Sequence, residues 1–391
     1  MTGRAGALEQ VLREADAAAV DALPTVVSRA LANVGVRAAV VYLLDYDVSL
    51  LLPVPGSLSL LESPEPQSVE DSRAGRACTR QELVETIEDG VHTVWVPISQ
   101  RFDCLGVLQL QLERLDDDLR GLCCDVGILL GHLLSTAHEY TDVYELLSRR
   151  HDMNLAAEMH WEVQPAMSYA GPRVRIAGGI EPAYEVGGDT FDYNINGDIV
   201  DFALLDAMGH GLEAALLSFQ AVAAYRYGRR RRQSLAEIAA TLEDTFVRQF
   251  GGDRFVTGIL CRLDLRTGAL GWVNAAHQPP LLMRDARLVG ELGGSPACPL
   301  GLGLESDLEV HEATIEPGDS IVLYSDGVVE ARSPAGDDFE FDRLRTFLEH
   351  EAAQKAPPSA AVRHILEEIK AHSSGPLHDD ATLLQFDYVK D

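Results

Sequence analysis

The feature that most constrains the fold is a predicted β-hairpin with an acidic motif at each end. The first motif is Gly187-Gly188-Asp189, and the second runs from Asp206 to Gly211. Between them, turn residues at 194–198 precede a β-branched, apolar strand at residues 199–205. Because a hairpin brings its open ends together, Asp189 and Asp206 are expected to be neighbours. The adjacent glycines supply backbone freedom where carboxylates crowd around a small ion.

Two more aspartates adjoin apolar strands far downstream. Asp326 follows the strand at 321–325, and Asp379 precedes the strand at 381–388. Taken singly, each aspartate is typical of a turn or a helix cap. Four that converge would repel one another and would require protons or cations. An all-oxygen ligand set without a His/Cys cage favours Mg²⁺ or Mn²⁺. The pattern therefore predicts a two-metal site that hydrolyses a phosphate ester.

Seven motifs occur in a fixed order along the chain. They are residues 182–189, 206–211, 254–257, 274–280, 299–301, 323–330 and 379–382. This order resembles the SpoIIE/RsbU branch of the PPM metal-dependent serine/threonine phosphatases. The resemblance implies a mixed α+β fold with an α-β-β-α sandwich over residues 166–391. It also implies a centre of two Mn²⁺ or Mg²⁺ ions and a phosphoserine or phosphothreonine protein as substrate.

The resemblance also assigns roles to individual residues. Asp206 would bridge both ions, Asp189 would serve one ion, and Asp326 and Asp379 would serve the other. Ala207 would contribute only its backbone carbonyl. These four aspartates are the catalytic residues that the resemblance implies.

Other residues near the motifs have weaker assignments. Asp192 and Asp380 are within reach of the cluster, but Asp380 is expected to point away from Asp379 if both lie on a strand. His210 and His277 are expected to shape their loops, and Ala276 stands where the family usually has Gly. The candidates for binding the substrate phosphate are Arg173, Arg175 and Arg254.

The length, net charge and cysteine spacing of the chain limit the number of domains, the class of partner and the compartment that we expect. A chain of 391 residues predicts two domains and a connector. The net charge of −29 argues against nucleic acid or an anionic membrane as the main partner. No apolar run reaches the roughly 20 residues that span a bilayer, and residues 1–6 are not followed by the apolar h-region of a signal peptide, so we expect a cytoplasmic protein. The six cysteines have no C-x-x-C spacing and are expected to be buried free thiols.

Residues 1–118 predict an α+β module with two leading helices, two hairpins and a short helix near residue 75. The segments at 75–77, 96–98 and 105–108 are similar to GAF domains, which sense small molecules or proteins. A structural dimerisation domain without a ligand is the alternative.

Residues 119–165 predict a connector helix. Apolar residues recur in steps of three and four at 119, 122, 126, 129, 133, 137, 140, 144, 147 and 151. This heptad seam, interrupted by one stutter, predicts a single helix of some forty residues and a parallel coiled-coil homodimer. The alternative is that its two halves pack on the N-terminal sheet and on the phosphatase domain.

The sequence therefore predicts a sensor-regulated protein phosphatase. The resemblance points to a STAS-type anti-anti-sigma protein as substrate, in a partner-switching pathway that controls a sigma factor. A catalytically silent sandwich that binds a signalling partner is the rival interpretation. The run Arg229-Arg230-Arg231-Arg232 is expected to be a solvated loop after a helix.

Overall fold

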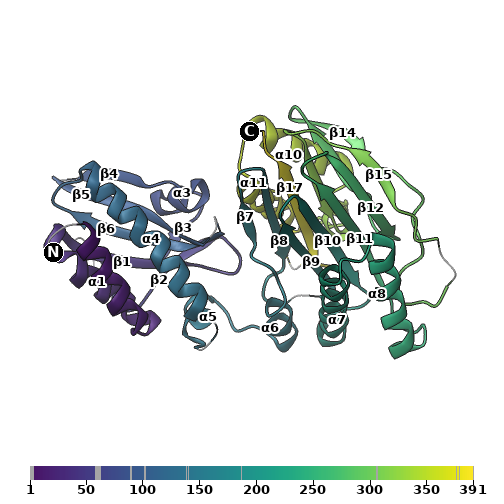
Figure 1. The fold of residues 1–391 in the computed structure, drawn as a ribbon, viewed down its shortest axis with the longest axis horizontal. Helices are drawn as coiled ribbons and strands as arrows, with labels where there is room; N and C mark the ends of the chain where they lie inside the picture. Colours follow the sequence, from purple (N-terminus) through teal and green to yellow (C-terminus); the bar gives the residue numbers. More distant parts are fainter. Residues whose placement is uncertain are drawn as a thin grey trace. The chain divides into compact units, whose positions relative to one another are not determined.

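The computed structural model describes residues 4–57, 63–88, 90–100, 103–137, 139, 141–185, 187–304, 307–375, 377 and 379–390. Val186 of the ordered motif at residues 182–189 and Tyr140 of the heptad seam lie outside the described residues. The chain divides into two compact units, residues 1–152 and 153–391 (Figure 1). Each unit has its own hydrophobic core, so the two are described separately.

The N-terminal unit is built on an antiparallel sheet of six strands. Their spatial order is β3 (Gln67–Ser68), β2 (Leu50–Pro53), β1 (Val36–Leu44), β6 (Asp103–Leu112), β5 (Val91–Gln100) and β4 (Val84–Glu88). The β1 and β6 strands pair closely at Gly106, where an added Cβ would lie 2.0 Å from the carbonyl oxygen of Tyr42. The Gly106 of the GAF-like segment is therefore required by strand packing.

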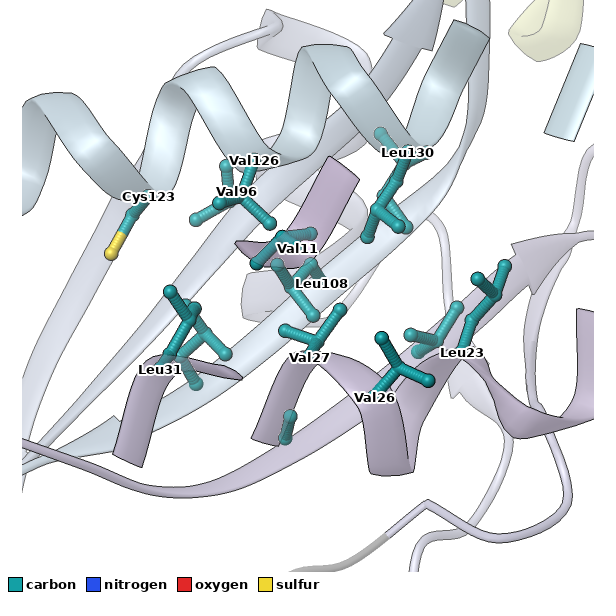
Figure 2. Close-up of a cluster of buried hydrophobic side chains, with 14 of the residues drawn as sticks. Val11, Leu23, Val26, Val27, Leu31, Val96, Leu108, Cys123, Val126 and Leu130 are labelled. Carbon is teal, nitrogen blue, oxygen red and sulfur yellow. The ribbon is translucent and has the colours of Figure 1, made fainter. Parts of the chain in front are cut away.

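Helices cover both faces of this sheet. They are α1 (Arg4–Asp16), α2 (Leu23–Leu31), α3 (Arg73–Arg80) and α4 (Asp117–Ala137), with short 3₁₀ turns at Val20–Ala22 and Ala32–Val34. Figure 2 shows Val11, Val27 and Val126, from α1, α2 and α4, in contact with the sheet residues Val96 and Leu108. On the opposite face, α3 buries a smaller cluster around Trp95. The predicted α+β module is present.

The expected continuous connector helix is wrong. The α4 helix ends at Ala137, α5 spans only Val143–Leu147, and residues 148–154 are not helical. The first half of the seam is already buried, because Leu122, Val126 and Leu130 pack in the N-terminal core. The stripe therefore needs no second chain to cover it, and the alternative of packing on the N-terminal sheet holds for this half.

In the described part of the chain, α4 is also the one helix that is long and apolar enough to cross a membrane. Leu122, Val126 and Leu130 are almost or completely inaccessible to solvent against the sheet. That is the position of a core helix in a folded domain.

The cysteine prediction is partly wrong. Cys78 on α3 and Cys104 on β6 form a disulfide, with Cα atoms 5.8 Å apart. The two residues are 26 positions apart in sequence, so spacing alone carried no sign of this pairing. Cys123 and Cys261 are buried thiols, as expected.

The C-terminal unit contains two antiparallel sheets. The first has the order β15 (His311–Thr314), β12 (Ala269–Ala275), β11 (Val256–Asp264), β10 (Ile199–Ala207) and β9 (Asp189–Asn196). The second has the order β14 (Arg287–Glu291), β13 (Leu281–Arg284), β16 (Ser320–Tyr324), β17 (Ala381–Tyr388), β8 (Val174–Glu181) and β7 (Ser168–Ala170).

The two sheets pack face to face, with helices on the outer sides (Figure 1). Phe202 of β10 and Phe386 of β17 stack between the sheets with ring centroids 5.1 Å apart. Helices α7 (Gly211–Arg230) and α8 (Leu235–Phe250) bury one outer face, and α10 (Phe341–Ala353) and α11 (Pro358–Ser373) bury the other. The shorter helices are α6 (Leu155–Trp161) and α9 (Asp326–Val329). This is the predicted α-β-β-α sandwich.

Candidate metal centre

Three side chains form a row across the end of the first sheet. Asp189 on β9 lies opposite Asp206 on β10, and Asp206 lies opposite Thr257 on β11. Side chains alternate along a strand, so Asp189 shares a face with Phe191, which is buried between the two sheets. The row therefore lies at one edge of the layer between the sheets, as the hairpin pattern predicted for the two aspartates.

Asp326 and Asp379 reach the same edge from the second sheet. Asp326 is the first residue of α9 and is separated from the end of β16 by Ser325 alone, and Asp379 lies two residues before β17. The charges of Asp326 and Asp379 both act on Asp206 and help raise its pKa. The four aspartates that the sequence singled out thus lie in one electrostatic neighbourhood.

Asp380 belongs to this edge as well, and sequence reasoning underestimated it. It is buried and accepts hydrogen bonds from the backbone N–H groups of Gly187, at 2.7 Å, and Asp189, at 3.3 Å. Its alternation with Thr382 and Leu384 on the inner face of β17 is the signal that could have found it. Asp380 thereby fixes the loop that carries Asp189.

Gly188 is required for the approach of the two acidic motifs. A Cβ at Gly188 would lie 1.9 Å from the carbonyl oxygen of Ala207. The N–H of Ala207 donates to the carbonyl of Gly188 at 3.1 Å, and the hydroxyl of Ser218 on α7 donates to the same oxygen. Any larger residue at 188 would push the Asp189 loop away from the end of β10.

Burial and mutual repulsion raise the pKa values of the clustered carboxyl groups. The pKa of Asp189 lies well above its usual range because of burial, with the charges of Asp206 and Asp380 adding to the effect. Burial is also the main cause that raises the pKa of Asp206 to about 6 and that of Asp380 to about 7. Partial burial and the charge of Asp326 raise the pKa of Asp379. A cation at this edge would relieve the cost of ionising these groups.

The donors present fit a hard divalent cation. The donor set is all oxygen, and Oδ2 of Asp189 is buried without a hydrogen-bond partner, which leaves an acceptor for a cation to fill. In the described parts of the chain, no three His, Cys, Asp or Glu side chains are already spaced to hold an ion. The oxygen donors and the negative charge at this edge of the sandwich fit a divalent metal. The carboxylates lie near one another, but they do not yet enclose an ion.

Asp192 was expected to be within reach of the carboxylate cluster, but its side chain lies on the other face of the sheet. It faces α7, where it pairs with Arg226 at 2.9 Å and with Arg229 at 2.8 Å. Alternation along β9 places it on the opposite face from Asp189. Arg229 is buried in the last turn of α7 and stacks on the Tyr225 ring, so the prediction of a solvated arginine run is wrong at this residue.

Two of the three candidate phosphate ligands lie at the wrong end of the sandwich. Arg173 pairs with Asp198, in the turn of the hairpin remote from Asp206. Arg175 lies opposite Asp387, near the far end of β17. Arg254 precedes β11 at the correct end, and its guanidinium pairs with Glu213 in the first turn of α7.

The two histidines that were expected to shape their loops lie in different surroundings. His210 is exposed at the residue before α7, whereas Nε2 of His277 is buried.

Comparison with solved structures identifies the class of the fold. The SiaA-PP2C domain of Pseudomonas aeruginosa aligns with a TM-score of 0.51 and 22% identity, covering 60% of this chain and 94% of that one. The sandwich is therefore a PP2C-type fold.

Sequence comparison then gives the family. Residues 196–389 match the model of Stage II sporulation protein E (SpoIIE). The C-terminal unit thus belongs to the SpoIIE/RsbU branch of the PPM phosphatases, as the motif order predicted.

Two curated relatives come from Bacillus subtilis. Phosphoserine phosphatase RsbU is 23% identical over 52% of this chain and 60% of its own length. Phosphoserine phosphatase RsbP is 24% identical over 44% of this chain and 43% of its own. The chain thus spans less than two thirds of the length of these relatives.

Proposed function

We propose that the protein is a metal-dependent serine/threonine protein phosphatase. The observation that carries the proposal is the convergence of Asp189, Asp206, Asp326 and Asp379 at one edge of a SpoIIE-family sandwich. The two relatives named as phosphoserine phosphatases support the same chemistry.

Two Mn²⁺ or Mg²⁺ ions would be held by these side chains. Asp206 would serve both ions, Asp189 one, and Asp326 and Asp379 the other, with the carbonyl of Ala207 as a further donor. When bound, such ions lower the pKa of water and stabilise charge on phosphoryl oxygens. The chain itself holds the Asp189 loop through Asp380.

Arg254 is the candidate for binding the substrate phosphoryl group. It is about one third exposed and lies beside the loop between β10 and α7, since Met208 N donates to the carbonyl of Phe255. Its partner Glu213 orients the guanidinium without burying it. A guanidinium binds phosphate oxygens through two parallel hydrogen bonds.

The substrate, regulation and compartment are further parts of the proposal. The branch implies a phosphorylated STAS-type anti-anti-sigma protein as substrate in a partner-switching pathway. The N-terminal unit would act as a GAF-like sensor that regulates turnover, in the cytoplasm. The charge of −29 disfavours nucleic acid as a partner.

The test is hydrolysis of p-nitrophenyl phosphate and of a phosphoserine STAS-type protein by the full chain, with Mn²⁺, with Mg²⁺ and with EDTA. Asp206→Asn preserves shape but removes a charged ligand, and is expected to lower turnover by at least about 100-fold. Asp198→Asn, at the other end of the same hairpin, is the matched control and is expected to remain within about twofold of wild type.

Loss of turnover in EDTA and preference for the phosphoprotein would support the proposal. Absence of turnover with either metal, combined with binding of the phosphoprotein, would instead favour the catalytically silent binding module.

A further inference from the structure

The motif at residues 274–277 has no role in the chemistry proposed above, yet a chain of hydrogen bonds links it to the centre. The β12 strand ends at Ala275, opposite Gly258 of β11. The next residues therefore emerge beside Thr257, which lies opposite Asp206.

A closed turn fixes the position of His277. The N–H of His277 donates to the side-chain oxygen of Asn274 at 2.8 Å, and the side-chain amide of Asn274 donates back to the carbonyl of His277 at 2.9 Å. Ala276 within this turn has a φ of 52°, in the left-handed region, which explains why glycine is usual there. Asn274 is itself buried, so the turn is held from inside the fold.

The side chains of the turn and strand continue toward the carboxylate. Nδ1 of His277 lies 3.3 Å from Oγ1 of Thr257, and that hydroxyl lies 3.2 Å from Oδ2 of Asp206. A carboxylate can only accept, so the Thr257 O–H donates to Asp206. The hydroxyl oxygen then accepts from Nδ1–H of His277.

The surroundings of the imidazole keep it neutral. Burial lowers the pKa of His277 to about 4, and a hydrogen bond to the backbone of Tyr324 opposes this only in part, so the ring carries one N–H near pH 7. Thr257 has one hydroxyl proton, and its donation to Asp206 places the imidazole proton on Nδ1, which leaves Nε2 as a buried acceptor.

We propose that Asn274, His277 and Thr257 form a positioning relay that holds the Asp206 carboxylate in the orientation that binds metal. The inference rests on the proposed function and adds to it three residues that touch neither metal nor substrate. Partners that orient a metal-binding carboxylate commonly change metal affinity by 10–100-fold when removed. The relay therefore acts on metal affinity before it acts on the chemical step.

The test measures Mn²⁺ affinity of the full chain by calorimetry and the Mn²⁺ concentration that half-saturates turnover. Thr257→Val keeps the β-branched shape and removes the hydroxyl, and is expected to weaken Mn²⁺ affinity by about tenfold. Thr257→Ser restores the donor and is expected to remain within about threefold of wild type. Tyr388→Phe is the control, because it removes the hydrogen bond from a buried hydroxyl to the carbonyl of Leu265, away from the centre. Its Mn²⁺ affinity is expected to be unchanged.

His277 offers a readout that a merely structural role would not give. An asparagine amide can replace Nδ1–H, whereas a glutamine amide lies nearer to the position of Nε2. His277→Asn is therefore expected to retain Mn²⁺ affinity better than His277→Gln, by about threefold or more.

The outcomes separate the two proposals. If wild type binds Mn²⁺ and hydrolyses phosphate esters but Thr257→Val binds Mn²⁺ equally well, the relay is refuted and the function stands. Equal affinities for the two His277 variants would refute the role of Nδ1. A wild-type chain that neither binds Mn²⁺ nor turns over would overturn the proposed function, and the relay with it.

Discussion

His160 is a histidine whose protonation is controlled by burial. It lies on α6 and is 1% exposed, with Nε2 against the side-chain amide of Gln164 and Nδ1 without a hydrogen-bond partner. Burial lowers its pKa from 6.5 to about 3. Gln164 in turn donates to Thr190, the neighbour of Asp189. One neutral histidine thus supports the loop that carries a candidate ligand.

The pKa of His160 predicts a loss of stability in acid. Below about pH 6.5 the unfolded chain takes up a proton that the folded chain excludes, so stability falls as pH decreases from 6.5 toward 3. The maximum slope is about 1.4 kcal/mol per pH unit, or roughly 2 kcal/mol at pH 5. His160→Gln cannot titrate, and its unfolding free energy is expected to fall less steeply between pH 7 and 5. Urea unfolding followed by tryptophan fluorescence measures both slopes, and equal slopes would show that His160 is protonated in the folded chain.

At the scale of elements, α7 is tied to β9 at two points. Near its start, Ser218 donates to the carbonyl of Gly188. Near its end, Arg226 and Arg229 both bind Asp192, and Arg226 also donates to the carbonyl of Val163. The helix that follows the Asp206 motif is thereby locked to the strand that carries Asp189. The geometry of the centre depends on a helix whose side chains do not enter it.

Removing the Asp192 charge is expected to destabilise the C-terminal unit. Asp192→Asn leaves two guanidinium groups without their carboxylate in a buried site, and breaking such a pair costs about 3 kcal/mol or more. The matched control is Asp198→Asn, which breaks the exposed pair with Arg173 and is expected to cost less than about 1 kcal/mol. Chemical denaturation of the two variants gives the comparison. Similar small losses in both would mean that water or other groups already satisfy the arginines.

At the scale of the whole molecule, the chain contains two units, and each has its own hydrophobic core. The N-terminal core lies between α1, α2, α4 and their sheet, and the C-terminal cores lie within and around the sandwich. All the carboxylates of the candidate centre belong to residues 153–391. The N-terminal unit therefore supplies none of the proposed ligands, which leaves it available for regulation.

The division into units predicts that residues 153–391 fold alone and respond to metal. At Mn²⁺ concentrations near 100 times the dissociation constant, binding adds about 2.7 kcal/mol, which raises Tm by roughly 5 °C or more. The full chain is expected to show the same shift in its C-terminal transition. Calorimetric scans with Mn²⁺ and with EDTA provide the measurement. A fragment that folds but shows no shift would mean that the N-terminal unit completes the centre.

Features that are set by interactions between nearby residues can be predicted from the sequence better than features that depend on contacts between distant residues. Residues 235–250 form α8, whose two ends are defined locally by a capping box at Ser234 and a glycine at 251. The long connector failed, since its apolar spacing suits a coiled coil and a core helix equally well. The strand β8 was missed altogether, although it pairs with β17 along its whole length.

The sequence by itself determined the four aspartates of the candidate centre, from their places at strand ends, and the ordered motifs implied the sandwich through their resemblance to a phosphatase family. Both kinds of signal lie within short stretches of sequence. Only the tertiary structure decided that Asp380 binds the loop of Asp189, that Asp192 pairs with α7, and that Thr257 and His277 reach Asp206. It also paired Cys78 with Cys104. Those assignments depend on which distant segments become neighbours in the fold, and a linear pattern does not carry that information.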